Sequence, residues 1–188
     1  MTTRVAPAGL AVLLAVLLSG CGGGGGSRLP NVSATESISL ESPAFTPGGA
    51  IPPSFTCDGP DTSPPLSWSG GPPSAEYVLA MSDFDSPGAA FTHWVVYRIS
   101  GHATSFPEGG IPQGAVEGRN DFGKVGYGGP CPPSGDPPHR YLFVIYGLRT
   151  AIGGSIPPGS GVDQVLDAVR CCIQAKGTLL GTYDRSGG

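Results

Sequence analysis

The chain has few charged residues and no concentration of basic ones. Asp, Glu, Lys and Arg make up 13% of its 188 residues, and 14 acidic against 10 basic side chains give a formal net charge of −4. Nucleic-acid-binding domains normally carry a basic patch, so we expect no nucleic acid among the partners. Internal repeats and coiled-coil heptads are also lacking, which favours one domain of ordinary size.

Glycine and proline are abundant instead. The 32 Gly and 21 Pro residues exceed ordinary usage, while hydrophobic residues still make up 39% of the chain. This composition favours short strands, many turns and long ordered loops over a helical bundle. Five runs of strand-forming residues lie between turn residues: 38–40, 77–81, 94–99, 141–146 and 178–183. The three main runs, 77–81, 94–99 and 141–146, are almost wholly apolar, as in central strands covered on both faces.

One helix is predicted near the C-terminus by apolar residues at helical spacing: Val162, Val165, Leu166, Val169, Cys172 and Ile173. Ser160 is expected to cap this helix, with Asp163 three residues later as in a capping box. Gly177 is expected to end it, and Cys172 to pack on its buried side.

The N-terminus has the features of an export signal. Arg4 precedes the apolar stretch 10–18, which is too short to span a membrane as a stable helix, and small residues follow it. Leu18-Ser19-Gly20-Cys21 resembles the bacterial lipobox, whose cysteine is lipidated after cleavage. The sequence therefore predicts a signal peptide over 1–20, a Gly-rich tether over 21–37, a domain over 38–184 and a tail over 185–188. It also predicts lipid attachment at Cys21 on the extracytoplasmic side of the cell membrane.

Four cysteines remain once Cys21 is assigned to lipid. Cys57 and Cys131 both lie in Pro/Gly-rich loops and are the natural disulfide pair outside the cytoplasm. The adjacent Cys171 and Cys172 are poorly placed to bond to each other. Four cysteines allow three pairings, so the pairing stays a prediction.

Acids and imidazoles gather at the ends of predicted strands. Asp83 and Asp85 are two residues apart, which places them on one side of extended backbone. His93 and His139 each precede an apolar run. If those strands are neighbours, the four side chains could hold an anion, ligate a divalent metal, or form a His–Asp general base. They could also simply cap turns and satisfy loop hydrogen bonds.

A family resemblance separates these alternatives. Residues 83–87 with His93-Trp94, and Pro138-His139-Arg140-Tyr141, resemble the two signatures of the phosphatidylethanolamine-binding protein family, in its bacterial Raf-kinase-inhibitor-like branch. The resemblance implies a mainly β fold, an antiparallel β-sandwich with long loops and a C-terminal helix. It also implies a small anion pocket, lined or rimmed by Asp83, Asp85, His93, Gly129, Pro130, Cys131, Pro132, His139 and Tyr141.

The function expected from these features is that of a lipid-anchored extracytoplasmic binding protein for a small phosphate-type or carboxylate ligand. One alternative is an inhibitor or interaction partner of a secreted hydrolase or signalling protein. A His/Asp hydrolase is a further alternative, but no Gly-x-Ser-x-Gly nucleophile motif is present, so we expect no enzyme activity. No cofactor or metal is expected.

Overall fold

The computed structural model describes residues 1–2 and 34–185. Nearly all of the predicted signal peptide, Cys21, most of the predicted tether and most of the predicted tail lie outside these residues. Among the residues described, no helix is long and apolar enough to cross a membrane.

The β-strands are β1 Glu36–Ser37, β2 Ser39–Glu41, β3 Leu66–Ser69, β4 Glu76–Asp83, β5 Phe91–Ser100, β6 Ser105–Phe106, β7 Val116–Glu117, β8 His139–Leu148 and β9 Ile173–Tyr183.

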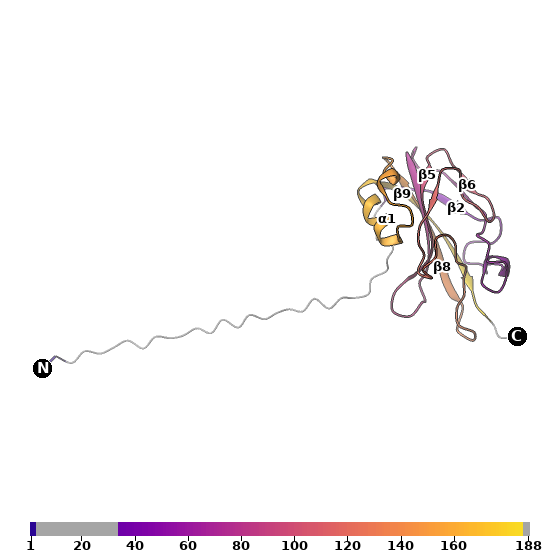
Figure 1. Cartoon of the computed structure of the whole chain (residues 1–188), viewed down its shortest axis with the longest axis horizontal. Helices are drawn as coiled ribbons and strands as arrows, with labels where there is room; N and C mark the ends of the chain where they lie inside the picture. Colours follow the sequence, from indigo (N-terminus) through magenta and orange to yellow (C-terminus); the bar gives the residue numbers. More distant parts are fainter. Residues whose placement is uncertain (3–33, 186–188) are drawn as a thin grey trace.

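Two sheets form the domain. The larger has the strand order β1-β9-β8-β4-β5-β7, and the smaller has the order β2-β3-β6. Neighbouring strands are antiparallel except β1, which pairs parallel with β9. Helix α1 (Val162–Val169) lies on one side of the large sheet, and β2 and β6 lie on the other (Figure 1). The predicted mainly β sandwich with a C-terminal helix is therefore confirmed.

The large sheet buries both of its faces, as its apolar runs predict. Alternate residues of β4 point to opposite sides, so Leu79 and Met81 join the core between the sheets while Val78 and Ala80 join the core under α1. Five runs predicted as strands fall in or across β2, β4, β5, β8 and β9. The structure extends the longer strands beyond their apolar centres, because backbone pairing continues where side chains become polar.

The C-terminal helix differs from the prediction in three respects. Its N-cap is Gly161, and the Ser160 hydroxyl donates to the Pro157 carbonyl instead of capping the helix. A short 3-10 turn, Arg170–Cys172, follows α1, and β9 begins at Ile173, so the expected stop at Gly177 lies inside a strand. Cys172 is half-buried rather than packed in the core. Two further 3-10 turns are Pro53–Phe55 and Gly153–Ser155.

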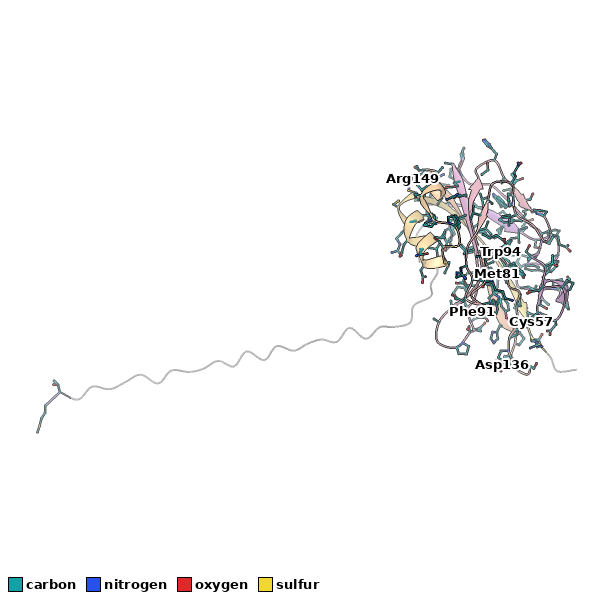
Figure 2. All side chains as sticks on the ribbon, viewed as in Figure 1. Cys57, Met81, Phe91, Trp94, Asp136 and Arg149 are labelled. Atoms are coloured by element: carbon teal, nitrogen blue, oxygen red, sulfur yellow. A yellow bond between two sulfur atoms is a disulfide. The ribbon has the colours of Figure 1, made fainter. Side chains whose placement is uncertain are left out.

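The antiparallel order brings the predicted site residues to one end of the sheet. β4 ends where β5 and β8 begin, and Asp83 is opposite Phe91 on one side and Tyr141 on the other. Figure 2 shows Phe91, Cys57 and Asp136 toward this end of the domain and Arg149 at the opposite end. Segments that are far apart in the sequence therefore meet at one end of three adjacent strands.

Candidate functional site

A small cavity lies at this end of the sheet. It has a volume of about 240 Å³. Its polar walls come from the end of β4 and the starts of β5 and β8, and its other walls come from loops. The lining residues are Asp83, Ser86, Pro87, Phe91, His93, Phe122, Cys131, Pro132, Pro133 and His139.

Asp83 and His139 form a buried hydrogen-bonded pair across β4 and β8. His139 Nδ1 lies 2.7 Å from Asp83 Oδ2, and the two side chains are 8% and 7% exposed. The other carboxylate oxygen of Asp83 accepts the backbone N–H of Asp85 at 2.8 Å. Each oxygen of Asp83 therefore has a donor, and the carboxylate fixes the orientation of the imidazole.

Asp85 is not among the residues that line the cavity. β4 ends at Asp83, so the alternation expected for extended backbone stops before Asp85. The Asp85 carboxylate instead accepts from Nε, Nη2 and the backbone N–H of Arg140, at 2.9, 2.7 and 2.8 Å. The hydrogen bonds from Arg140 hold the pKa of Asp85 below its usual range. The structure therefore gives Asp85 a partner in Arg140 rather than a place among the residues lining the cavity.

His93 lines the cavity from the start of β5. Its Nδ1 lies 2.7 Å from the carbonyl oxygen of Gly128, and the residue is 3% exposed. The rings of Phe91, Phe122 and Tyr141 contact it edge-on, with centroids 5.2–5.3 Å away. Burial lowers the pKa of His93, although the Gly128 carbonyl and the charge of Asp83 act in the opposite direction. The ring is therefore neutral at pH 7.

The lowered pKa predicts a loss of stability on mild acidification. The unfolded chain protonates His93 near pH 6.5, whereas the folded protein resists protonation, so the free energy of unfolding should decrease as the pH falls below about 6.5. His93→Gln is expected to flatten this dependence between pH 7.5 and 5.5, while His102→Ala, at an exposed position, retains it. Urea unfolding at several pH values measures the effect. Equal slopes for wild type and His93→Gln would contradict the prediction.

Tyr141 lies behind the two histidines. Its ring stacks on His139 with centroids 6.5 Å apart and contacts His93 edge-on. Its hydroxyl is buried near the backbone of Cys131 without a hydrogen bond of good geometry. Burial raises the pKa of Tyr141 well above its usual value, so the phenol stays protonated. Tyr141 supports the two imidazoles but is not among the residues that line the cavity.

The rim loop over 128–133 is attached to a second loop by several contacts. A disulfide joins Cys57 to Cys131, which is the pairing predicted from the sequence. Asp61 Oδ1 accepts the backbone N–H of Gly129 at 2.7 Å. A Cβ on Gly129 would lie only 2.4 Å from that oxygen and from the Phe55 carbonyl, so only glycine fits this approach. Of the four predicted rim residues, Cys131 and Pro132 line the cavity; Gly129 and Pro130 lie behind them in the same loop.

The polar groups of the cavity suit a small polar ligand better than a metal. In the described part of the chain, no three His, Cys, Asp or Glu side chains are close enough to hold an ion. A larger cavity of about 410 Å³ lies nearby, but its charged lining residues are Asp61 and Glu117, which would repel an anion. The smaller cavity is lined by the imidazoles of His93 and His139 and by Asp83, whose two carboxylate oxygens each accept a hydrogen bond.

Sequence reasoning missed several wall and support residues. Phe91 is two residues before His93 on β5, so strand alternation could have placed the two on one face. Phe122 comes from the loop after β7, and no periodic signal marks it. Asp61 supports the rim from the loop that also carries Cys57, in a left-handed conformation with φ 58°. These contacts depend on how long loops fold back, which single-sequence patterns do not encode.

Comparisons with known proteins agree with the fold, and one relative is named as a lipoprotein. Residues 41–184 match the family model described as phosphatidylethanolamine-binding protein. "Putative lipoprotein LppC" of Mycobacterium tuberculosis is 36% identical over 197 aligned residues, covering 97% of this chain and 96% of that protein. The crystal structure of CT736 from Chlamydia trachomatis has a TM-score of 0.72 and 37% identity, covering 80% of this chain and 99% of that one. E. coli YbcL, described as a member of the mammalian PEBP family, has a TM-score of 0.71 and 33% identity, covering 78% and 98%.

Proposed function

Because this chain belongs to the phosphatidylethanolamine-binding protein family, we propose that it binds a small anionic ligand, phosphate-type or carboxylate, in the cavity between His93 and His139. We propose further that it does so on the extracytoplasmic side of a membrane, anchored by lipid on Cys21. The alignment of nearly the whole chain with a protein named as a lipoprotein supports the anchor.

The observation that carries this proposal is the paired state of both carboxylates. Asp83 would repel an anion if its charge faced the cavity freely, but its oxygens are bound to His139 Nδ1 and to the Asp85 backbone. Asp85 is neutralised by Arg140. His139 can then present its Nε2 to a ligand, and as an imidazolium it would donate to an oxyanion.

The size of the cavity supports a ligand no larger than a headgroup. Sites for drug-sized molecules usually enclose at least about 300 Å³, and this cavity has about 240 Å³. Phe91, Phe122 and the prolines of the rim also give it an apolar mouth. A phosphate or carboxylate with a short substituent would fit, whereas acyl chains would remain outside.

Inorganic phosphate is expected to raise the melting temperature of the wild-type protein. A ligand at 100 times its Kd adds about 2.7 kcal/mol of stability, which corresponds to a shift of roughly 5–10 °C in a domain of this size. His139→Ala removes the donor and should abolish the shift, whereas His102→Ala, at an exposed turn, should retain it. Differential scanning calorimetry measures the shift. The proposal fails if no phosphate-type or carboxylate anion stabilises the wild type.

The alternative of an inhibitor or interaction partner stays a prediction. It would place a side chain or chain terminus of another protein in the same cavity, so the loss of phosphate binding in His139→Ala does not separate the two functions. A partner captured from the cell envelope by wild type and not by His139→Ala would favour the alternative.

A further inference from the structure

His93 offers a hydrogen-bond acceptor to the cavity, and its tautomer follows from one contact. The carbonyl oxygen of Gly128 can only accept a hydrogen bond, so the proton of the neutral ring must be on Nδ1, 2.7 Å away. Nε2 is then unprotonated. The ring is among the residues that line the cavity, so a ligand that reaches Nε2 there meets a lone pair.

The surroundings of His93 keep it in this form. Three aromatic rings contact the imidazole, from Phe91, Phe122 and Tyr141, and the residue is nearly sealed from solvent. The acidic groups that act on it, Asp83 and Asp61, favour protonation, but the cost of burying a charge exceeds their effect and lowers the pKa of His93.

His139 faces the same cavity with a different capacity. Its Nδ1 is bound to Asp83, so Nε2 is the atom left for a ligand, with the carboxylate of Asp136 3.8 Å away. Asp85 also acts on this group electrostatically. Protonated His139 donates from Nε2. The hydroxyl of Ser86 can donate or accept, and none of the described residues that line the cavity is Lys or Arg.

We infer that the cavity selects oxyanions that carry their own proton, because such a ligand can accept from His139 and donate from its X–OH group to Nε2 of His93. This inference rests on the proposed function and narrows it to phosphate-type ligands, because an ionised carboxylate carries no proton. Inorganic phosphate keeps a P–OH group throughout the neutral pH range, whereas sulfate has none. A phosphate monoester loses its P–OH group above its second pKa of about 6.

Isothermal titration calorimetry of the wild-type protein with phosphate, sulfate and methyl phosphate tests this selection. At pH 7.5 we expect phosphate to bind at least about 100-fold more tightly than sulfate. Sulfate has no proton to donate, so one of its oxygen lone pairs would face the lone pair of His93 Nε2, and both would lack a hydrogen bond. Between pH 5.5 and 7.5, methyl phosphate should weaken roughly 20-fold more than phosphate does, as its protonated fraction falls. Any effect of pH on the protein groups around the ligand acts on phosphate and methyl phosphate alike and cancels when the two affinities are compared. These groups are His139, Asp83, Asp136 and Asp85.

Two variants separate the roles of the histidines. His93→Gln places an amide where Nε2 was, and this amide can rotate to donate, so the ratio of phosphate to sulfate affinity should fall to near one. His139→Ala removes the donor that both anions use, so it should abolish the binding of phosphate and sulfate alike. If either variant fails to fold, the comparison of the three anions with the wild-type protein still tests the inference.

The results distinguish failure of the inference from failure of the proposed function. Sulfate and phosphate binding within threefold of each other in the wild type would overturn the selection of a protonated ligand and leave an anion site. An unchanged ratio in folded His93→Gln would also overturn it. Binding of methylammonium, with no binding of any anion, would overturn the proposed function itself.

Discussion

Replacing Cys57 and Cys131 together by serine is expected to lower the free energy of unfolding by about 4 kcal/mol. The disulfide closes a loop with a sequence separation of 74, and the chain-entropy relation for a loop of this length gives about this value. A loss of this size is a large fraction of the 5–15 kcal/mol that stabilises an ordinary domain.

The disulfide should also affect the cavity, because it joins the two loops that form and support the rim. Cys57 donates its backbone N–H to Pro130, and Tyr127 donates its hydroxyl to the carbonyl of Phe55. Cys131 and Pro132 line the cavity directly. Without the covalent link only non-covalent contacts hold the rim, so phosphate affinity should fall together with stability.

Urea unfolding of the double serine variant, with phosphate titrated into the folded protein, measures both effects. The matched control replaces Cys171 and Cys172 by serine, since these residues are free thiols at exposed and half-buried positions and should change stability by less than about 0.5 kcal/mol. A reducing agent should lower the stability of the wild type and leave the double variant of Cys57 and Cys131 unchanged. Equal stability of wild type and that variant would contradict the argument.

The sequence predicts the central strands well because their side chains are buried on both faces. The runs 77–81, 94–99 and 141–146 lie inside β4, β5 and β8. The helix boundary was predicted less well. A capping residue depends on where the chain turns, and here Arg119 from another loop donates its backbone N–H to the Ser160 carbonyl. Tertiary pairing therefore moved the N-cap by one residue.

The candidate site shows the same division. Asp83, His93 and His139 were predicted from their positions at strand ends, and the antiparallel order of three neighbouring strands brings them together. Asp85 was predicted to lie on the same side as Asp83 because side chains alternate along extended backbone. That alternation holds only within a strand, and β4 ends at Asp83, two residues before Asp85. Phe122 and Asp61 reach the site through loops whose course is set by contacts distant in the sequence.

Asp83→Ala is expected to cost about 3 kcal/mol of stability and to abolish phosphate binding. The change leaves the buried His139 Nδ1 and the backbone N–H of Asp85 without their acceptor, and two unsatisfied donors together typically cost about this much. The imidazole also loses the contact that orients it toward the cavity. Urea unfolding and calorimetry with phosphate measure the two losses.

Asp83→Asn separates the structural loss from the functional one. The carboxylate accepts from two donors, His139 Nδ1 and the Asp85 backbone N–H, but an amide has only one oxygen. If that oxygen faces His139, the Asp85 N–H loses its acceptor. If it faces Asp85, the amide N–H₂ faces His139 Nδ1, and the imidazole proton moves to Nε2. The variant should lose only about 1 kcal/mol of stability, yet it removes the carboxylate charge that supports an imidazolium. We therefore expect a folded protein whose phosphate affinity is at least tenfold lower, with a changed His139 tautomer in ¹⁵N NMR spectra. Wild-type affinity in this variant would show that Asp83 only fills space, and the pairing of acid and imidazole would lose its role in binding.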